Sequence, residues 1–120
     1  DLGREFVLVV DEAHRFLRKG RALSKLFREG RKYGISSILI TQDVNSIPRE
    51  LLLNAATLIS FSLPEISTAR YVAKIVSPDD ADLYEKILGK LTSLPQFYAL
   101  VFIPGLGSYI VDTRKPNPTR

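Results

Sequence analysis

The sequence predicts an α/β fold built around a mainly parallel β-sheet. Apolar runs of strand length alternate with amphipathic segments of helical period, in the order β-α-β-α-β-α-α-β-β along the 120 residues. This alternation is typical of parallel strands with helices on both faces of the sheet, and two final strands separated by a short turn indicate a C-terminal β-hairpin. We therefore expect one domain over residues 1–113, followed by a tail at residues 114–120.

The elements follow from the apolar periodicity and from helix-capping residues. Strands are predicted at residues 6–10, 35–41, 57–63, 97–103 and 109–111. Helices are predicted at residues 13–19, 22–33, 66–76 and 78–91, and a short helix between the second and third strands ends near Asn54. Ser46 and Ser77 are the expected N-caps of the helices that follow them, each with a proline in the first turn. Gly34 is well placed to end its helix in the left-handed conformation.

The composition excludes several classes of protein. The absence of cysteine excludes disulfides and thiolate metal sites, and a single histidine, His14, excludes a multi-histidine site within this chain. No apolar run approaches the roughly 20 residues that span a bilayer, and no signal peptide is visible, so we expect a cytoplasmic protein without a membrane partner. The sequence also lacks methionine and opens directly into a strand. We therefore expect a fragment of a longer protein, or a protein that has been shortened at its ends.

Positive charge is concentrated between residues 15 and 32. This block carries a net charge of +7 in a chain of net +4, so the remainder carries −3. Its eight basic residues are Arg15, Arg18, Lys19, Arg21, Lys25, Arg28, Arg31 and Lys32. Two interpretations remain open: the block faces phosphates of a nucleotide or a nucleic acid, or it is a solvated helix face.

Two carboxylates follow the first predicted strand, in the run VLVVDEAH at residues 7–14. A continuous apolar run predicts a strand buried on both faces, and Asp11 and Glu12 then stand at its carboxyl end, where open α/β sheets bind ligands. The pattern matches the Walker B motif of P-loop NTPases, in which one acid holds magnesium and the next activates the attacking water. The alternative is that both acids only cap the following helix.

Three further polar residues extend this candidate site. Gln42 follows the second strand, and in a parallel sheet it would share an edge with the acids, where an amide can hold water or sense a terminal phosphate. Arg31 precedes the same strand and either stabilises a transferring phosphoryl group, often across a subunit boundary, or complements the dipole of its own helix. His14 either couples the nucleotide state to the nearby helix or is a hydrogen-bonded residue behind the site.

Taken together, VLVVDEAH, REGRKYGISSILITQD and IPRELLLNAATLISFSL resemble the HerA/FtsK superfamily of ring-forming P-loop ATPases. Archaeal HerA-like helicases and DUF87-type ATPases are the nearest in appearance, and the likeness is dense over residues 6–63. The resemblance implies a RecA-like fold, ATP and Mg²⁺ as ligands, and a homo-hexamer that pulls DNA through its pore. It also implies Asp11 as the magnesium acid, Glu12 as general base and Gln42 as sensor, with Arg31 as arginine finger and Arg28 in reserve.

One departure from that superfamily is decisive. The phosphate loop GxxxxGK[ST], which supplies most of the grip on the phosphates, is absent from these 120 residues. We therefore expect the C-terminal part of a RecA-like ATPase domain, which by itself binds ATP weakly or not at all, hydrolyses none measurably and is a monomer or weak dimer. Two alternatives are an ATPase that moves protein or signals instead of moving DNA, and a non-catalytic oligomerisation or binding module.

Overall fold

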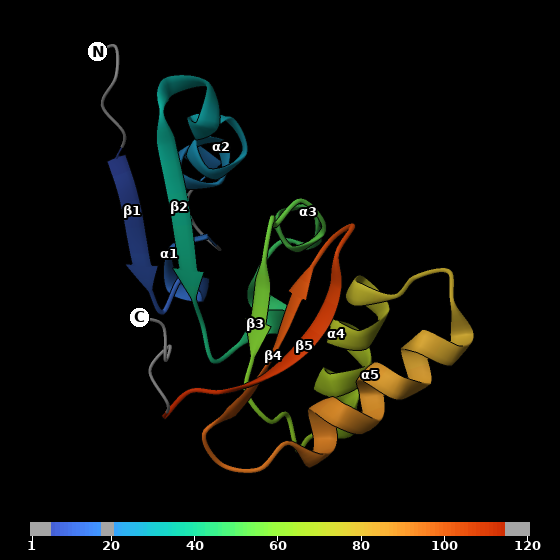
Figure 1. Cartoon of the computed structure of the whole chain (residues 1–120). Helices are drawn as coiled ribbons and strands as arrows, with labels where there is room; N and C mark the ends of the chain where they lie inside the picture. Colours follow the sequence, from blue (N-terminus) through green and yellow to red (C-terminus); the bar gives the residue numbers. More distant parts are fainter. Residues whose placement is uncertain (1–5, 18–20, 115–120) are drawn as a thin grey trace, which may run out of the picture. The chain divides into compact units, whose positions relative to one another are not determined.

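The computed structural model describes residues 6–17 and 21–114 of the chain. The chain divides into two compact units, Asp1–Leu52 and Leu53–Arg120 (Figure 1). The first unit contains β1 (Phe6–Asp11), α1 (His14–Leu17), α2 (Arg21–Glu29), η1 (Gly30–Tyr33), β2 (Ile35–Ile40) and η2 (Val44–Ser46), and α3 (Arg49–Leu53) runs to its border. The second contains β3 (Leu58–Ser60), α4 (Ile66–Val76), α5 (Ala81–Ser93), β4 (Tyr98–Ile103) and β5 (Gly107–Asp112).

The first unit is built on a parallel pair of strands. Phe6 of β1 pairs with Ile35 of β2, and Asp11 pairs with Ile40, so the two strands run together and end together (Figure 1). Gly34 makes this possible, because it ends η1 at a φ of 75°, which only glycine adopts at no cost. Its carbonyl accepts the Phe6 N–H at 3.0 Å, which joins the turn to the start of β1.

The core of the first unit lies on one face of this pair. Ala13, Leu17, Ile47 and Leu51 form a buried cluster, against which Val10, Phe27, Leu39 and Leu52 pack. Alternate side chains of a strand point to opposite faces. The other face carries Val7, Val9, Ile38 and Ile40, which are between 47% and 62% exposed. Within the first unit the prediction of burial on both faces is therefore wrong for β1 and β2, because no described element of that unit covers this second face.

The second unit contains a three-stranded antiparallel sheet in the order β3-β4-β5. Ile59 pairs with Val101, and Val101 pairs with Tyr109. The C-terminal hairpin is thus confirmed, and β3 adds to it as a third strand, antiparallel to β4. The α/β class holds, with one parallel and one antiparallel sheet in the described residues. The long α4–α5 connection between β3 and β4 allows either direction, so the order of elements alone does not determine it.

Helices α4 and α5 pack against each other through small and branched side chains. The sequence-predicted inner face of α4 is confirmed, since Ala69, Val72, Ala73 and Val76 are all buried. Ile87 and Leu91 of α5 and Leu100 of β4 are the largest fully buried side chains among the described residues. The Leu63 N–H donates to the Leu91 carbonyl at 2.8 Å, which ties the segment after β3 to the end of α5. No helix in the described part of the chain is both long and apolar enough to cross a bilayer.

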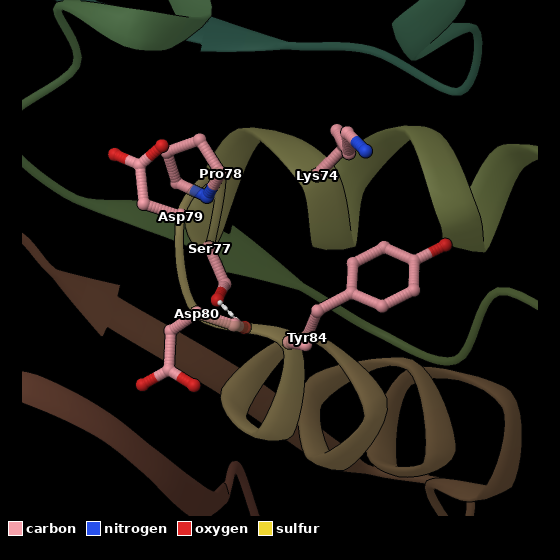
Figure 2. Close-up of a pocket in the computed structure, with 7 residues that line it drawn as sticks. Lys74, Ser77, Pro78, Asp79, Asp80 and Tyr84 are labelled. Carbon is pink, nitrogen blue, oxygen red and sulfur yellow. Dashed lines mark hydrogen bonds between the residues drawn. The ribbon is translucent and has the colours of Figure 1, made fainter.

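The junction of α4 and α5 corrects one predicted cap. Ser77 follows the last turn of α4, and its hydroxyl donates to the Asp80 carbonyl at 2.9 Å (Figure 2). Asp80 is the N-cap of α5, because its carboxylate accepts the Leu83 N–H at 3.1 Å. Ser46 likewise lies inside η2 and does not cap α3. In both places the serine hydroxyl donates to an aspartate three residues away, Asp80 for Ser77 and Asp43 for Ser46. The turn therefore involves both residues, whereas the sequence predicted a role for the serine alone.

The segment after β5 is anchored at its start. Arg114, the first residue of the predicted tail, donates to both carboxylate oxygens of Asp112 at 2.9 Å and lies over the Phe97 ring at 5.3 Å. The hydrogen bonds and the charge of Asp112 raise the pKa of Arg114 above its usual value. The rest of the predicted tail lies outside the described residues.

The turn after β1 contains a strained backbone. Glu12 has a φ of 53°, in the left-handed region that residues with a Cβ rarely adopt. This conformation turns the chain sharply from β1 toward α1, and it costs on the order of 1–2 kcal/mol for a residue other than glycine. Glu12 is one of two residues other than glycine with positive φ in the described chain, the second being Phe97.

We predict that the Asp80→Ala substitution lowers the free energy of unfolding by about 1 kcal/mol, because the first turn of α5 loses its capping acceptor. Asp79→Ala is the matched control, since it removes the same charge beside the same helix but no N-cap hydrogen bond, and we expect it to cost less than about 0.5 kcal/mol. Urea unfolding followed by far-UV circular dichroism measures both. Equal losses in the two variants would contradict the assignment of Asp80 as the cap.

We also predict that Glu12→Gly raises the free energy of unfolding by about 0.5–1 kcal/mol, because glycine relieves the left-handed strain. Glu12→Ala keeps the strain and loses the Glu12 side chain, so it should be no more stable than the unmodified protein. The same urea titration compares the two variants. If alanine and glycine gave the same stability, the left-handed conformation at this position would be refuted.

Candidate functional site

The polar residues that follow β1 and β2 lie at one edge of the parallel pair. Asp11 is the last residue of β1 and pairs with Ile40, the last residue of β2. The Ala13 N–H donates to the Ile40 carbonyl at 2.9 Å, so the segments that follow β1 and β2 stay paired one step beyond the strands. In Figure 1 the arrowheads of β1 and β2 lie at the same end of the pair. Glu12 follows β1 directly and Gln42 comes two residues after β2, so the structure brings Asp11, Glu12 and Gln42 to this end.

The two acids differ in their local contacts. Asp11 is exposed, and its Oδ1 accepts the Glu12 N–H at 2.8 Å. Glu12 Oε1 lies 2.9 Å from Arg15 Nε, in a pair whose side chains are 47% and 69% exposed. Such an exposed pair contributes at most about 1 kcal/mol, so it can open at little cost. The strained backbone of Glu12 is the kind of feature that recurs at functional sites.

These acids suit a hard cation only in part. In the described residues no group of three or more His, Asp or Glu side chains comes together, so they form no metal cage made of protein alone. Mg²⁺ commonly uses one or two carboxylates and takes its other ligands from phosphates and water. An exposed carboxylate at a strand end, with a second acid next to it, fits that mode of binding.

Thr41, which was not among the predicted site residues, joins the two loops of the site. Its Oγ1 accepts the Asp43 N–H at 2.9 Å, which folds a tight turn around Gln42. The same Oγ1 lies 2.9 Å from His14 Nδ1. Asp43 in turn accepts the Ser46 hydroxyl at 2.6 Å. A threonine two residues before an aspartate at a strand end is a signal for such a turn, but the contact with His14 spans 27 residues and leaves no local pattern.

The candidate arginine finger does not join the acids. Arg31 is exposed and lies in η1, before β2, whereas Gln42 follows the other end of that strand. Six residues of extended chain separate these ends by roughly 20 Å, more than an arginine side chain can span. Arg28 Nη1 lies 3.2 Å from Glu50 Oε1 of α3, so this reserve candidate is held in an ion pair.

The described part of the basic block leaves both of its interpretations open. Lys25, Arg31 and Lys32 are exposed, and Arg15 and Arg28 have acidic partners. Arg18 and Lys19 lie outside the described residues. The shallow pocket in Figure 2, between α4 and α5, belongs to the second unit, whereas every candidate site residue belongs to the first.

Comparison with known proteins yields three kinds of match. Residues 5–86 match the family described as the TraM recognition site of TraD and TraG. A probable helicase, MJ1565 of Methanocaldococcus jannaschii, is 32% identical in an alignment 114 residues long, which covers 87% of this chain and 21% of the helicase. The chain therefore spans about a fifth of that relative.

The genome-packaging NTPase B204 of Sulfolobus turreted icosahedral virus 2 has a similar structure. Its complex with ATP-γS superposes with a TM-score of 0.72 at 22% identity, over 88% of this chain and 54% of B204. Its complex with sulfate gives a TM-score of 0.69 at 26% identity, over 95% of this chain and 55% of B204. The fold is thus that of a P-loop ATPase and corresponds to part of a RecA-like domain, as the sequence predicted. The chain belongs to the family of the TraD and TraG recognition site, within the HerA/FtsK-type superfamily of P-loop ATPases.

Proposed function

We propose that this chain supplies the water-activating and phosphate-sensing part of an ATP-hydrolysing motor that moves DNA. The observation that carries the proposal is that β1 and β2 run parallel and end together, with Asp11, Glu12 and Gln42 at or just after their carboxyl ends. Ligands of open α/β sheets bind at this edge. The relatives support the direction of the proposal, since one is described as a probable helicase and another as a genome-packaging NTPase.

In this mechanism Glu12 accepts a proton from the water that attacks the terminal phosphate of ATP. The exposed ion pair with Arg15 occupies one carboxylate oxygen of Glu12. For proton transfer, either this ion pair opens or the other carboxylate oxygen accepts the proton. Asp11 would hold Mg²⁺, which supplies neutralising charge to the phosphates when bound. Gln42 is exposed at the same edge, and its neutral amide can hydrogen-bond water or the terminal phosphate without adding charge.

The grip on the phosphates must come from polypeptide that these 120 residues do not include. They contain no GxxxxGK[ST] sequence, and they span about half of B204 and a fifth of the helicase. Backbone amides and the lysine of a phosphate loop provide most of the affinity for ATP in P-loop proteins. The isolated chain is therefore expected to bind ATP weakly and to turn over none.

Arg31 can act only on a neighbouring subunit in this proposal. It lies at the amino edge of the β1–β2 pair, opposite the acids of its own chain, and its side chain is exposed. A ring of identical subunits, with a homo-hexamer as the expected form, would place this edge of one subunit against the acidic edge of the next. An arginine in that position stabilises charge on the phosphoryl group in transfer.

A second candidate function is a non-catalytic docking module. It is favoured by the description of the matching family as a recognition site on TraD and TraG and by the exposed apolar face that includes Val7, Val9, Ile38 and Ile40. A third, an ATPase that moves protein or signals, shares the chemistry of the first. DNA-stimulated turnover would separate the motor on DNA from both alternatives.

For hydrolysis, we expect no turnover of Mg-ATP by the 120-residue chain and clear turnover by a protein that joins it to its phosphate loop. In that longer protein Glu12→Gln should lower kcat by about 10²–10⁴-fold, because the amide cannot accept the proton. Glu50→Gln is the matched control, an exposed acid of the same unit that is paired with Arg28. A steady-state phosphate-release assay measures all four samples. Unchanged turnover in Glu12→Gln would remove the catalytic assignment.

For DNA, we expect the affinity of the chain for duplex DNA to fall steeply with salt if the basic block contacts phosphates. Replacing Arg31 and Lys32 by glutamine should lower the slope of log K against log salt by about 1.8, because each lost phosphate contact contributes about 0.9. Lys86 and Lys90 of α5, outside the block, provide a double-glutamine control of equal charge. Fluorescence anisotropy at several salt concentrations gives the slopes. No affinity at low salt would leave the nucleotide-facing and solvated-face interpretations.

A further inference from the structure

We propose that His14 and Thr41 are positioning residues that hold the Glu12 and Gln42 loops at a fixed separation. The inference rests on the proposed function of this edge and goes beyond it, because neither residue is assigned a role there. We call the hydrogen bond between His14 Nδ1 and Thr41 Oγ1 the interloop latch. It is 2.9 Å long, partly buried, and joins residues 27 positions apart in the sequence.

The latch stands where the backbone pairing ends. At this edge, the last backbone hydrogen bond between the β1 segment and the β2 segment runs from the Ala13 N–H to the Ile40 carbonyl. His14 and Thr41 are the next residues on each side, so their side chains continue the connection one step further. Glu12 precedes Ala13 and Gln42 follows Thr41, so these two candidate functional residues are within two positions of the latch.

One hydroxyl group controls both halves of the connection. Thr41 Oγ1 already accepts the Asp43 N–H at 2.9 Å, which fixes the turn that presents Gln42. A threonine hydroxyl has two acceptor sites and one donor, so it can still donate to a neutral His14 Nδ1 or accept from its N–H. In either tautomer the position of the Gln42 turn depends on the position of His14.

Loss of the latch should leave the unit folded but change the position of the Glu12 and Gln42 loops. A single net hydrogen bond of this kind changes a conformational equilibrium by about two- to tenfold. The buried cluster that includes Ala13, Leu17, Ile47 and Leu51 holds the unit together without it. Misplacing a reacting group by about 1 Å, however, can cost about a hundredfold in rate. The expected effect therefore appears in catalysis and not in folding.

The first test uses turnover by the longer protein that includes the phosphate loop. Thr41→Val keeps the shape of the side chain and removes the hydroxyl, and we expect kcat to fall at least tenfold while KM for ATP stays within about twofold. Thr41→Ser restores the hydroxyl and should recover most of kcat. His14→Asn keeps a polar atom near the Nδ1 position and should retain more activity than His14→Gln, whose polar atoms reach toward Nε2. Ser37→Ala, an exposed hydroxyl of β2, is the control.

The second test does not depend on hydrolysis. His14 is the only histidine of the chain, so its ring nitrogens give one set of signals in a ¹⁵N spectrum of the 120-residue protein. Thr41→Val should shift the Nδ1 signal, and His14→Ala should shift the backbone amide signals of Gln42 and Asp43, while Ser37→Ala shifts neither. Circular dichroism checks that each variant is folded, and Thr41→Ala, which also removes the hydroxyl, replaces Thr41→Val in the comparison if the valine variant is not.

The two tests separate the latch from the proposed function. If Glu12→Gln leaves turnover unchanged, the proposed function fails, and the nuclear magnetic resonance spectra still decide whether the latch holds Gln42. A kcat of Thr41→Val within twofold of the unmodified protein would overturn the positioning role. The positioning role would also be overturned if the His14 ring signal did not shift in Thr41→Val, or if the Gln42 amide signal did not shift in His14→Ala.

Discussion

The parallel pairing of β1 with β2 is the constraint on which the candidate site depends. Asp11 opposite Ile40, and the Ala13–Ile40 backbone bond beyond it, bring the acid pair and the amide to one edge. A slip of one residue would turn the side chains of one strand to the opposite faces of the sheet. The left-handed Gly34 at one end and the strained Glu12 at the other make the turns that this register requires.

Charge is separated along the same pair of strands. Acids and an amide occupy the carboxyl edge, and Arg31 and Lys32 precede β2 at the amino edge. Within one chain the length of β2 keeps these groups apart, so the cations cannot neutralise phosphates bound beside Asp11. Under the proposed function, the amino edge of one subunit would lie next to the carboxyl edge of another, so that Arg31 would act on the ATP of a neighbouring subunit.

The side chains behind the acids extend the site beyond the residues that a motif can identify. His14 is part of the run VLVVDEAH, but its role as a link becomes visible only through Thr41, which the fold brings to within 2.9 Å. Arg15 is similar, since its contact with Glu12 places a cation directly on the candidate base. Both contacts bear on how freely Glu12 can move, and neither changes the identity of the residues that would act on ATP.

The sequence by itself determined the elements and the edge. Its apolar runs predicted five strands, its helical periodicity predicted the inner face of α4, and the positions of Asp11, Glu12 and Gln42 after parallel strands predicted that they meet, because these features depend on local periodicity and on strand direction. Only the tertiary structure decided the direction of β3, the cap at Asp80, the open face of β1 and β2, the distance of Arg31 from the acids and the contact of His14 with Thr41. The cap at Asp80 is a local contact with Leu83, and Ser77 and Asp80 are both residue types that favour such a position. Each of the other features depends on which distant segments pack together, and no short stretch of the chain encodes the free energy of that packing.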